Sequence, residues 1–324
     1  MIKLDKIKII SSIKNISNIN DEKFQCIVKE GEIKEQKIKI KTPHLLEIRA
    51  NYQEKELTIE FTSKILKDDC IQLINKNNIQ QCLTNINQFG ICTLNVEGII
   101  ADGDVVKCDV SKDVDCQDCK SLTKQLRSGV TNFQKYLPRI IGGNFVIEKN
   151  VTTKGLKKRL TIYDKGSEIL LAANREFLAS VKDKGAILDY FTGKVRFELN
   201  LNSKEQIRQS LGILDTSIQS VLGTTSTPIW DFLNKVLDDG SDYNSRSTLN
   251  EFKNELLLKY CENDLAKVEA IVRSYSSPNS HISQMMKPYK ELAIKLSENL
   301  SPNLKQQLRN LLLEIVILIG IVSI

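Results

Sequence analysis

The chain has 324 residues, enough for about two average domains. Its 41 % hydrophobic and 27 % charged residues are ordinary globular proportions, which excludes wholesale disorder, a collagen helix and a continuous coiled coil. Lys and Arg outnumber Asp and Glu by 46 to 40, so the net charge of +6 permits a polyanionic partner without requiring one.

The first hundred residues are rich in alternating apolar and polar residues, which predict strands at 24–29, 33–41 and 57–62. Apolar residues at helical spacing predict a helix over 68–88, with Asp68 or Asp69 as its N-cap and Gly90 at its end. Strands are expected again at 91–96 and 104–113.

Strands and helices alternate through the next hundred residues. The pattern predicts helices at 118–128, 168–182 and 203–211, and strands near 139–148, 158–165 and 194–201, with a turn or bulge at Gly142-Gly143. We therefore expect an α+β fold with a central, mainly antiparallel sheet and helices on one face, followed by a helical C-terminal region.

The last hundred residues have helical spacing, interrupted by a linker-like stretch at 238–247. We divide the chain into a strand-rich part at 1–100, a sheet domain at 90–225 and a helical region at 226–324. The apolar residues 315–324 are too few to span a membrane. We expect them to form a buried terminal helix or strand, with a peripheral membrane contact or a truncated chain as alternatives.

The eight cysteines are irregularly spaced and no apolar signal segment opens the chain, which favours reduced thiols in a cytoplasm. Cys116-x-x-Cys119 lacks the second pair that a zinc site needs, so plain thiols are favoured over zinc or redox chemistry. The two histidines, His44 and His281, are expected to be structural. They lie too far apart in sequence for a histidine pair on one strand.

Three of the expected strands carry polar residues on one face, because side chains i and i+2 of a strand point the same way. Each has an apolar opposite face, formed in the strand at 104–113 by Val106, Cys108 and Val110. If the strands are neighbours, their polar faces combine the following residues: Lys107, Asp109, Ser111, Asp113, Thr161, Tyr163, Lys165, Arg196, Glu198 and Asn200. The alternative is the ordinary solvated face of an antiparallel sheet.

This set of residue types suits phosphodiester cleavage, which needs a nucleophile, a divalent cation and positive charge near the phosphate. Tyr163 could form a covalent phosphotyrosine, with Lys165 and Arg196 against the phosphate. The oxygen ligands for Mg²⁺ or Mn²⁺ would be Asp109, Asp113 and Glu198.

A basic run precedes Tyr163, and a solvated loop is its ordinary explanation. Its position beside the expected nucleophile favours contacts with a DNA backbone instead. The candidate DNA-binding residues are Lys107, Lys154, Lys157, Lys158 and Arg159.

Residues 90–215 resemble the rolling-circle replication initiators of plasmids and filamentous-type phages. The resemblance is carried by Tyr163-Asp-Lys165 followed by Glu168, by Arg196-Phe-Glu198 with the helix after it, and by Asp109-x-x-x-Asp113 upstream. It implies an endonuclease that nicks one strand at an origin and stays attached through Tyr163, with Asp109, Asp113 and Glu198 on the metal side. The partners implied are origin DNA, single-stranded or cruciform, a host helicase and polymerase in a bacterial cell, and a second copy of the chain.

The chain departs from the family in lacking the histidine–hydrophobe–histidine strand with which many such initiators bind metal. Either it belongs to a branch that uses carboxylates, or its nuclease is altered or lost. Tyr190, Tyr243 and Tyr260 remain alternative nucleophiles. Two other functions stay open: a non-catalytic, sequence-specific DNA-binding protein on the same scaffold, and a structural or host-interaction protein.

Overall fold

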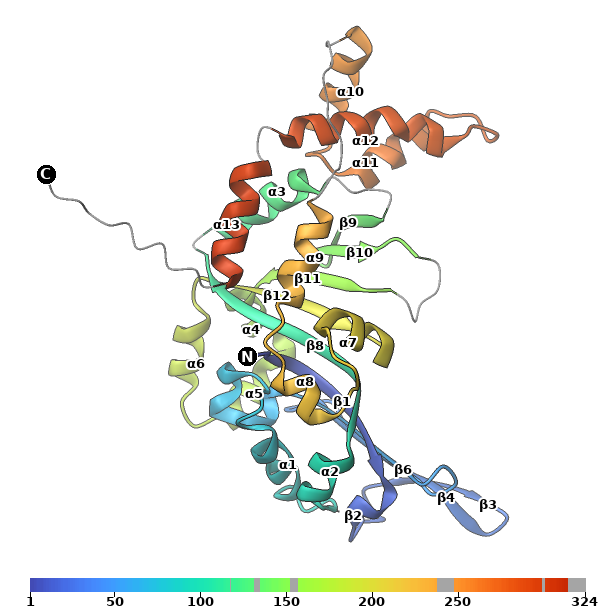
Figure 1. Cartoon of the computed structure of the whole chain (residues 1–324), viewed down its shortest axis with the longest axis vertical. Coiled ribbons are helices and arrows are strands. Elements are labelled where there is room, and N and C mark those ends of the chain that lie inside the picture. The colour runs from blue at the N-terminus through green and yellow to red at the C-terminus, as the bar shows by residue number, and fades with distance from the viewer. Residues whose placement is uncertain (117, 131–134, 152–156, 238–247, 299–300, 314–324) are drawn as a thin grey trace, which may run out of the picture. The chain divides into compact units, whose positions relative to one another are not determined.

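The computed structural model of the chain describes all residues except 117, 131–134, 152–156, 238–247, 299–300 and 314–324 (Figure 1). The linker-like stretch at 238–247 and the apolar residues 315–324 lie outside the described residues. The chain divides into two compact units that interleave in sequence. The first comprises 1–115, 152–158 and 164–228, and the second comprises 116–151, 159–163 and 229–324. None of the described helices is both long and apolar enough to cross a membrane.

The first unit is built on an antiparallel sheet with the strand order β3-β4-β5-β6-β1-β8-β12. Its strands are β1 (Leu4–Ser12), β3 (Gln25–Lys29), β4 (Glu32–Ile40), β5 (Leu46–Asn51), β6 (Glu56–Thr62), β8 (Asp104–Asp115) and β12 (Lys194–Leu201). Two short strands, β2 (Ile16–Ser17) and β7 (Thr93–Leu94), pair separately. The mixed α+β class with a large antiparallel sheet is confirmed.

The first unit also contains short helices, some of which pack on this sheet and the others on neighbouring helices. They are η1 (Ile13–Asn15), η2 (Ser63–Gln72), α1 (Ile79–Asn87), α2 (Val96–Asp102), α4 (Lys165–Ile169), η4 (Ala172–Asn174), α5 (Arg175–Ser180), α6 (Lys184–Phe191), α7 (Lys204–Leu211) and α8 (Ile218–Gly223). Helices α2, α7 and α8 contact β1 and β8. The sheet contributes Leu4, Ile7 and Ile9, which are fully buried, to the core.

Two β-bulges interrupt the pairing of β1 with β8, one between Leu4 and Lys6 and one between Lys8 and Ile9. The second bulge displaces Val106, so Val105 enters the core in its place and has no exposed surface. The expectation that Val106 faces the core is therefore wrong, because the neighbouring Val105 faces it instead.

The second unit contains three antiparallel strands in the order β11-β10-β9 and a set of helices. Its elements are α3 (Cys119–Gly129), β9 (Tyr136–Ile141), β10 (Asn144–Lys149), β11 (Arg159–Asp164), α9 (Pro228–Val236), α10 (Leu249–Tyr260), α11 (Leu265–Ser274), α12 (Ile282–Glu298) and α13 (Ser301–Leu313). The single strand expected near 139–148 is instead the antiparallel pair β9 and β10. Of the turn or bulge expected at Gly142-Gly143, the structure has a turn, with φ of 58° and 86° at the two glycines. The helical character of the C-terminal region is also confirmed.

Several expected elements are shorter or broken. The helix expected over 68–88 is divided between the end of η2 and α1, because the side chains of Asn75 and Asn78 bind the backbone between them. The residue at the N-cap position of α1 is Asn78, so the expected cap at Asp68 or Asp69 is wrong for this helix. The strand expected at 91–96 is β7 alone, since Asn95 caps α2 directly after it. The helix expected at 168–182 is divided among α4, η4 and α5.

Candidate functional site

Two strands that are far apart in sequence place carboxylates side by side on the polar face of the first unit's sheet. In the pairing of β8 with β12, Asp109 lies opposite Asn200 and Ser111 opposite Glu198. The Asn200 amide donates to Asp109 Oδ1 at 2.8 Å and to Glu198 Oε1 at 3.3 Å. One amide therefore holds two carboxylates together, and we call Asp109, Glu198 and Asn200 the Asp109 site.

The Asp109 carboxyl is only 7 % exposed. Burial raises its pKa above the ordinary value, although the Asn200 hydrogen bond and the nearby ammonium groups of Lys107 and Lys6 act in the opposite direction. A buried carboxyl with a raised pKa costs folding free energy at neutral pH, and such groups concentrate at functional sites.

Asp113, four residues further along β8, has a different environment. Arg196 donates to both of its oxygens, at 2.6 and 2.8 Å, and to Asp5 Oδ1 at 2.7 Å. Ser63 also donates to Asp5, at 2.9 Å. We call these four residues the Arg196 cluster. Arg196 is 1 % exposed, so its guanidinium is fully committed to carboxylates inside the protein.

This arrangement separates the three expected metal ligands. Asp109 and Asp113 are four residues apart along an extended strand, or about 13 Å, and cannot bind the same ion. Both oxygens of Asp113 are taken by Arg196. In the part of the chain that the structure describes, no three His, Cys, Asp or Glu side chains converge as a metal-ligand group. Of the three expected ligands, Asp109 and Glu198 are the two that lie together, and two carboxylates suffice for Mg²⁺ when substrate phosphates complete its coordination.

Asp5 was not singled out by sequence reasoning. Its position follows from the first bulge, where Asp5 is the extra residue between Leu4 and Lys6. A bulge re-aims the side chain of the extra residue, and no local pattern in Leu-Asp-Lys indicates one.

Lys165 was expected to lie on a strand beside Tyr163, and this is wrong. Strand β11 ends at Asp164, whose carboxylate caps α4 by accepting from the Ser167 amide at 2.8 Å. Lys165 is the first residue of α4, where it is 6 % exposed and pairs with Glu168.

The Lys165–Glu168 pair extends into a second buried network. Asn174 donates to the backbone oxygen of Glu168 at 2.7 Å, and Lys64 donates to Asn174 Oδ1 at 2.6 Å. The Phe191 ring lies under two cations, with Lys165 Nζ at 5.4 Å and Arg196 Cζ at 5.6 Å from its centroid. Lys165 and Arg196 are thus matched by carboxylates and an aromatic ring, which favours structural roles for both.

Tyr163 lies in β11, in the second unit, and is half-buried. Among the alternative nucleophiles, Tyr243 lies outside the described residues. Tyr260 is 81 % exposed on α10. Burial, with a smaller effect of Asp113, raises the pKa of Tyr190, which disfavours its phenolate.

Two side chains of the basic run that precedes Tyr163 have partners within the protein. Lys158 donates to Ser210 of α7 at 2.6 Å, and Arg159 donates twice to Glu148 of β10, at 2.8 and 2.6 Å. The Lys157 carbonyl accepts from Asn202 at 3.3 Å, and Lys154 lies outside the described residues. Lys107 is half-buried on the polar face of the sheet, opposite Lys8 of β1.

The buried thiols are poor nucleophiles. Burial raises the pKa of Cys70 and of Cys82 to about 12 and that of Cys92 to about 11. Cys116 and Cys119 are half-buried at the start of the second unit.

The Asp109 site can accept protons, bind a hard divalent cation through two carboxylates and present nearby ammonium groups to an anion. A cation site and positive charge are two of the three requirements of phosphodiester cleavage, and the third, a nucleophile, is not part of the Asp109 site. No family model, no curated protein and no solved structure matches the chain.

Proposed function

We propose that the chain is a rolling-circle replication initiator that nicks one DNA strand at an origin, acting in the bacterial cytoplasm. The observation that supports it best is the pairing of Asp109 with Glu198 through Asn200, on neighbouring strands of an antiparallel sheet. The sequence resemblance places these same acids in the family's metal-side motifs. The lack of a histidine pair then fits a site built on carboxylates.

Tyr163 is the proposed nucleophile. Its phenolic oxygen forms a bond to phosphorus and loses its proton, while the bond between phosphorus and the 3′ oxygen breaks and that oxygen takes up a proton. Because a polymerase extends a 3′-hydroxyl, the protein must remain on the 5′ phosphate. Asp109 and Glu198 would hold Mg²⁺ or Mn²⁺, which supplies neutralisation of charge on the non-bridging oxygens.

The first test is the formation of a covalent protein–DNA adduct on supercoiled circles that carry the DNA flanking the coding sequence. We expect wild type to nick them with Mg²⁺ or Mn²⁺ and to leave an adduct that survives denaturing electrophoresis. Tyr163→Phe is expected to abolish both products, since it removes only the attacking oxygen. Tyr275→Phe, at an exposed position that is not among the candidate nucleophiles, is the matched control.

Three outcomes discriminate the alternatives. An adduct that persists in Tyr163→Phe would move the nucleophile to another tyrosine. DNA binding by wild type without nicking in either metal would support a non-catalytic, sequence-specific DNA-binding protein. Negligible affinity for DNA at low salt would point to a structural or host-interaction protein.

A further inference from the structure

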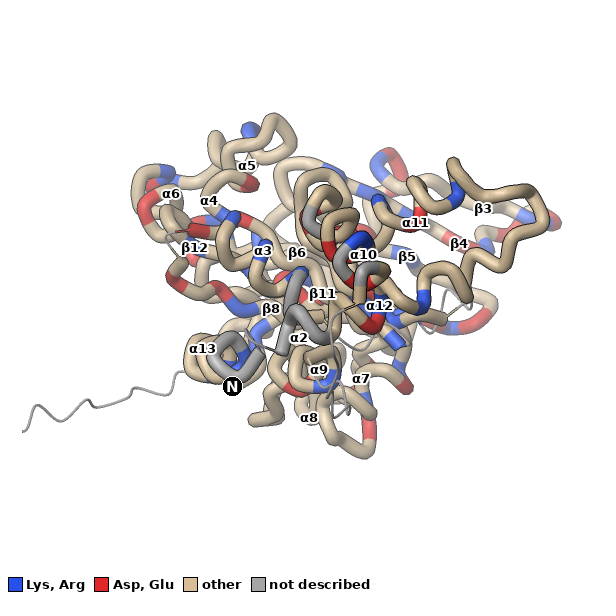
Figure 2. The backbone as a smooth tube through the Cα atoms, turned by 90° about the horizontal axis from the view of Figure 1, so that it is seen from above, with Lys and Arg blue, Asp and Glu red and all other residues tan. Residues whose placement is uncertain are grey.

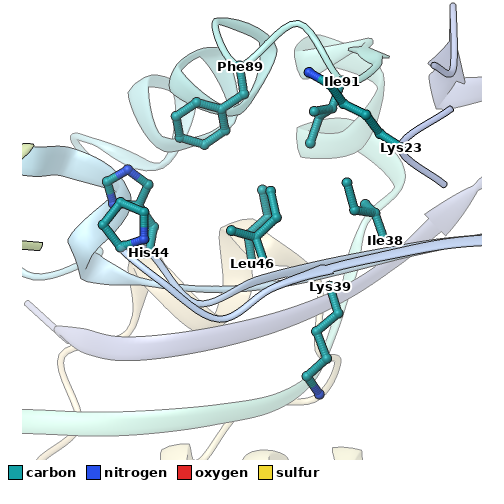
Figure 3. A pocket seen from close by; sticks show the side chains of 9 residues that line it. Lys23, Ile38, Lys39, His44, Leu46, Phe89 and Ile91 are labelled. Carbon is teal, nitrogen blue, oxygen red and sulfur yellow. The ribbon is translucent and has the colours of Figure 1, made fainter. Parts of the chain in front are cut away.

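A hollow of about 630 Å³ lies at one edge of the first unit's sheet, distant in sequence from the Asp109 site (Figure 3). Ile38 of β4 and Leu46 of β5 form one side, and Phe89 and Ile91 from the segment after α1 form the other. The lining is mainly aliphatic and aromatic, which is typical of sites for small organic groups.

His44 lines this hollow and contributes a polar atom with no partner. Its ring stacks on Phe89 with centroids 5.3 Å apart and planes 10° from parallel. The side chain is 6 % exposed, and its Nδ1 is buried without a hydrogen-bond partner among the described residues. An unsatisfied buried nitrogen destabilises the fold, and a ligand with a polar edge would satisfy it.

The hollow continues over an open edge of the sheet. Strand β3 pairs with β4 only up to Lys37, so Ile38, Lys39 and Ile40 pair on one side alone, with β5. A second hollow of about 440 Å³ lies here and shares Lys23, Ile38 and Lys39 with the first. The two hollows therefore form one continuous surface around the edge of β4.

This edge is basic. Lys23, Lys37, Lys39 and Lys41 line the second hollow. Lys37 and Lys39 share one carboxylate, Glu47, at 2.9 and 2.8 Å. In Figure 3, Lys39 points away from Phe89, toward the polar face of the sheet. Lysines at alternate positions of a strand recur about every 6.6 Å, which suits a chain of regularly spaced anions.

We propose that this edge binds single-stranded nucleic acid, with one base inserted against Phe89 and His44. The adjoining phosphates would lie on the lysines of the second hollow, which are Lys23, Lys37, Lys39 and Lys41. The identity of the ligand rests on the proposed function. A base offers a flat face for stacking and a polar edge for His44 Nδ1, and phosphates match the lysines. A purely apolar ligand would leave both the nitrogen and the lysines unused.

The test measures the binding of a fluorescein-labelled oligodeoxythymidylate by anisotropy, beside an abasic phosphodiester chain of the same length. Phe89→Leu and His44→Phe are expected to weaken binding of the thymidylate roughly tenfold, because stacking or the polar contact is lost. Neither variant should alter binding of the abasic chain. His44→Phe keeps a ring beside Phe89, so it serves if Phe89→Leu loosens the fold.

The phosphate contacts are tested separately through salt. Lys23→Gln and Lys41→Gln should each reduce the slope of log affinity against log salt by ~0.7, equally for both oligonucleotides. Lys29→Gln, at the other end of β3, is the matched control and should leave the slope unchanged.

Equal affinity of wild type and Phe89→Leu for the thymidylate would overturn the inference. So would binding of an acidic peptide along β4 with no binding of the oligonucleotide, which would assign the edge to a peptide strand. Failure of the proposed function can be distinguished from failure of this inference. In that case the thymidylate still binds in a Phe89-dependent manner, and no covalent adduct forms on any DNA. If a covalent adduct forms but Phe89→Leu leaves the affinity for the thymidylate unchanged, this inference is refuted and the proposed function is not.

Discussion

At the residue scale, two aspartates of one strand have opposite electrostatic environments. Asp109 is buried beside an uncharged amide, and burial raises its pKa. Asp113 is neutralised by a bidentate arginine. A buried carboxylate without a full countercharge destabilises the folded state. A buried carboxylate that is fully paired destabilises it only when its partner is removed. The two therefore respond in opposite ways to substitution.

Asp109→Asn is expected to raise the melting temperature at pH 7–8 while lowering kcat for nicking. Because the folded-state pKa of Asp109 is raised, wild type loses stability as pH rises from the ordinary carboxyl range through that raised pKa. The loss is about 1.4 kcal/mol for every tenfold difference in proton affinity between the folded and unfolded protein. The variant has no such loss, and its amide oxygen can still accept from Asn200. Thermal unfolding at several pH values measures this.

The gain should vanish below the ordinary carboxyl pKa, where Asp109 is protonated in both states. Asp189→Asn, at an exposed position on α6, is the control and should change little at any pH. An Asp109→Asn protein that is less stable than wild type at pH 8 would show that the carboxylate is stabilising.

Arg196→Met is expected to destabilise the fold by about 3–5 kcal/mol at neutral pH, because Asp5 and Asp113 lose their shared cation. Burial would raise the pKa of Asp5, but Arg196, Lys165 and Ser63 outweigh it and hold that pKa below the ordinary value. This contribution is present above the ordinary carboxyl pKa and is lost as pH falls. The penalty measured by denaturant unfolding should therefore shrink in acid.

Arg208→Met supplies the comparison. Arg208 pairs with Glu205 on the exposed side of α7, with side chains 46 % and 54 % exposed, and such pairs contribute at most about 1 kcal/mol. A similar loss in both variants would mean that Arg196 acts through packing and not through charge.

At the element scale, the first unit depends on tight junctions between helices and strands. Gly103 joins α2 to β8 and has no room for a side chain. A Cβ there would lie 2.3 Å from the Ile99 carbonyl oxygen and 2.9 Å from Ile218 Cδ1. The junction fixes where β8 begins, and with it the register that places Asp109 opposite Asn200.

Gly103→Ala is expected to cost about 1–3 kcal/mol of unfolding free energy, because backbone atoms must move to admit the methyl group. Gly223→Ala, in the last turn of α8, meets nothing within 4 Å and should be neutral or stabilising by up to about 1 kcal/mol. Equal denaturation midpoints for the two variants would contradict the steric argument.

At the scale of the whole molecule, the polar face of the first unit's sheet connects the Asp109 site to the basic edge of β4. The register places Lys39, Glu47, Glu60, Lys8 and Lys107 in one row from β4 to β8. Figure 2 shows acidic and basic residues mixed along β4 and β5. Four interstrand steps span roughly 19 Å, a distance that several nucleotides of single strand can cover.

Cleavage of single-stranded origin oligonucleotides should therefore separate two effects. Phe89→Leu is expected to raise KM several-fold with kcat unchanged, because it weakens binding away from the reacting phosphate. Asp109→Asn should lower kcat. The Phe89 effect should disappear once the oligonucleotide is too short to reach the edge of β4, and an effect that persists on the shortest cleavable substrate would contradict this path.

The sequence by itself determined much of the framework around the site. The alternation of residues predicted β12 at its observed bounds, and the serine cap predicted α7. It also predicted that Asp109 and Glu198 share a polar face with Arg196 and Asn200. These features depend on periodicity and capping, which involve only a few neighbouring residues and can therefore be predicted from the local sequence.

Only the tertiary structure decided which polar groups meet. Arg196 binds Asp5 because a bulge turns the Asp5 side chain toward it. The register of β12 with β8 places Arg196 opposite Asp113, and its hydrogen bonds to both Asp113 oxygens keep that carboxylate from binding a metal. Lys165 lies in α4 and not in the expected strand, because Asp164 caps that helix. His44 lines a hollow because α1 ends where Phe89 can stack on its ring. Each of these arrangements depends on contacts between residues that are far apart in the sequence. Strand register, bulges and packing determine such contacts, and the local sequence pattern does not.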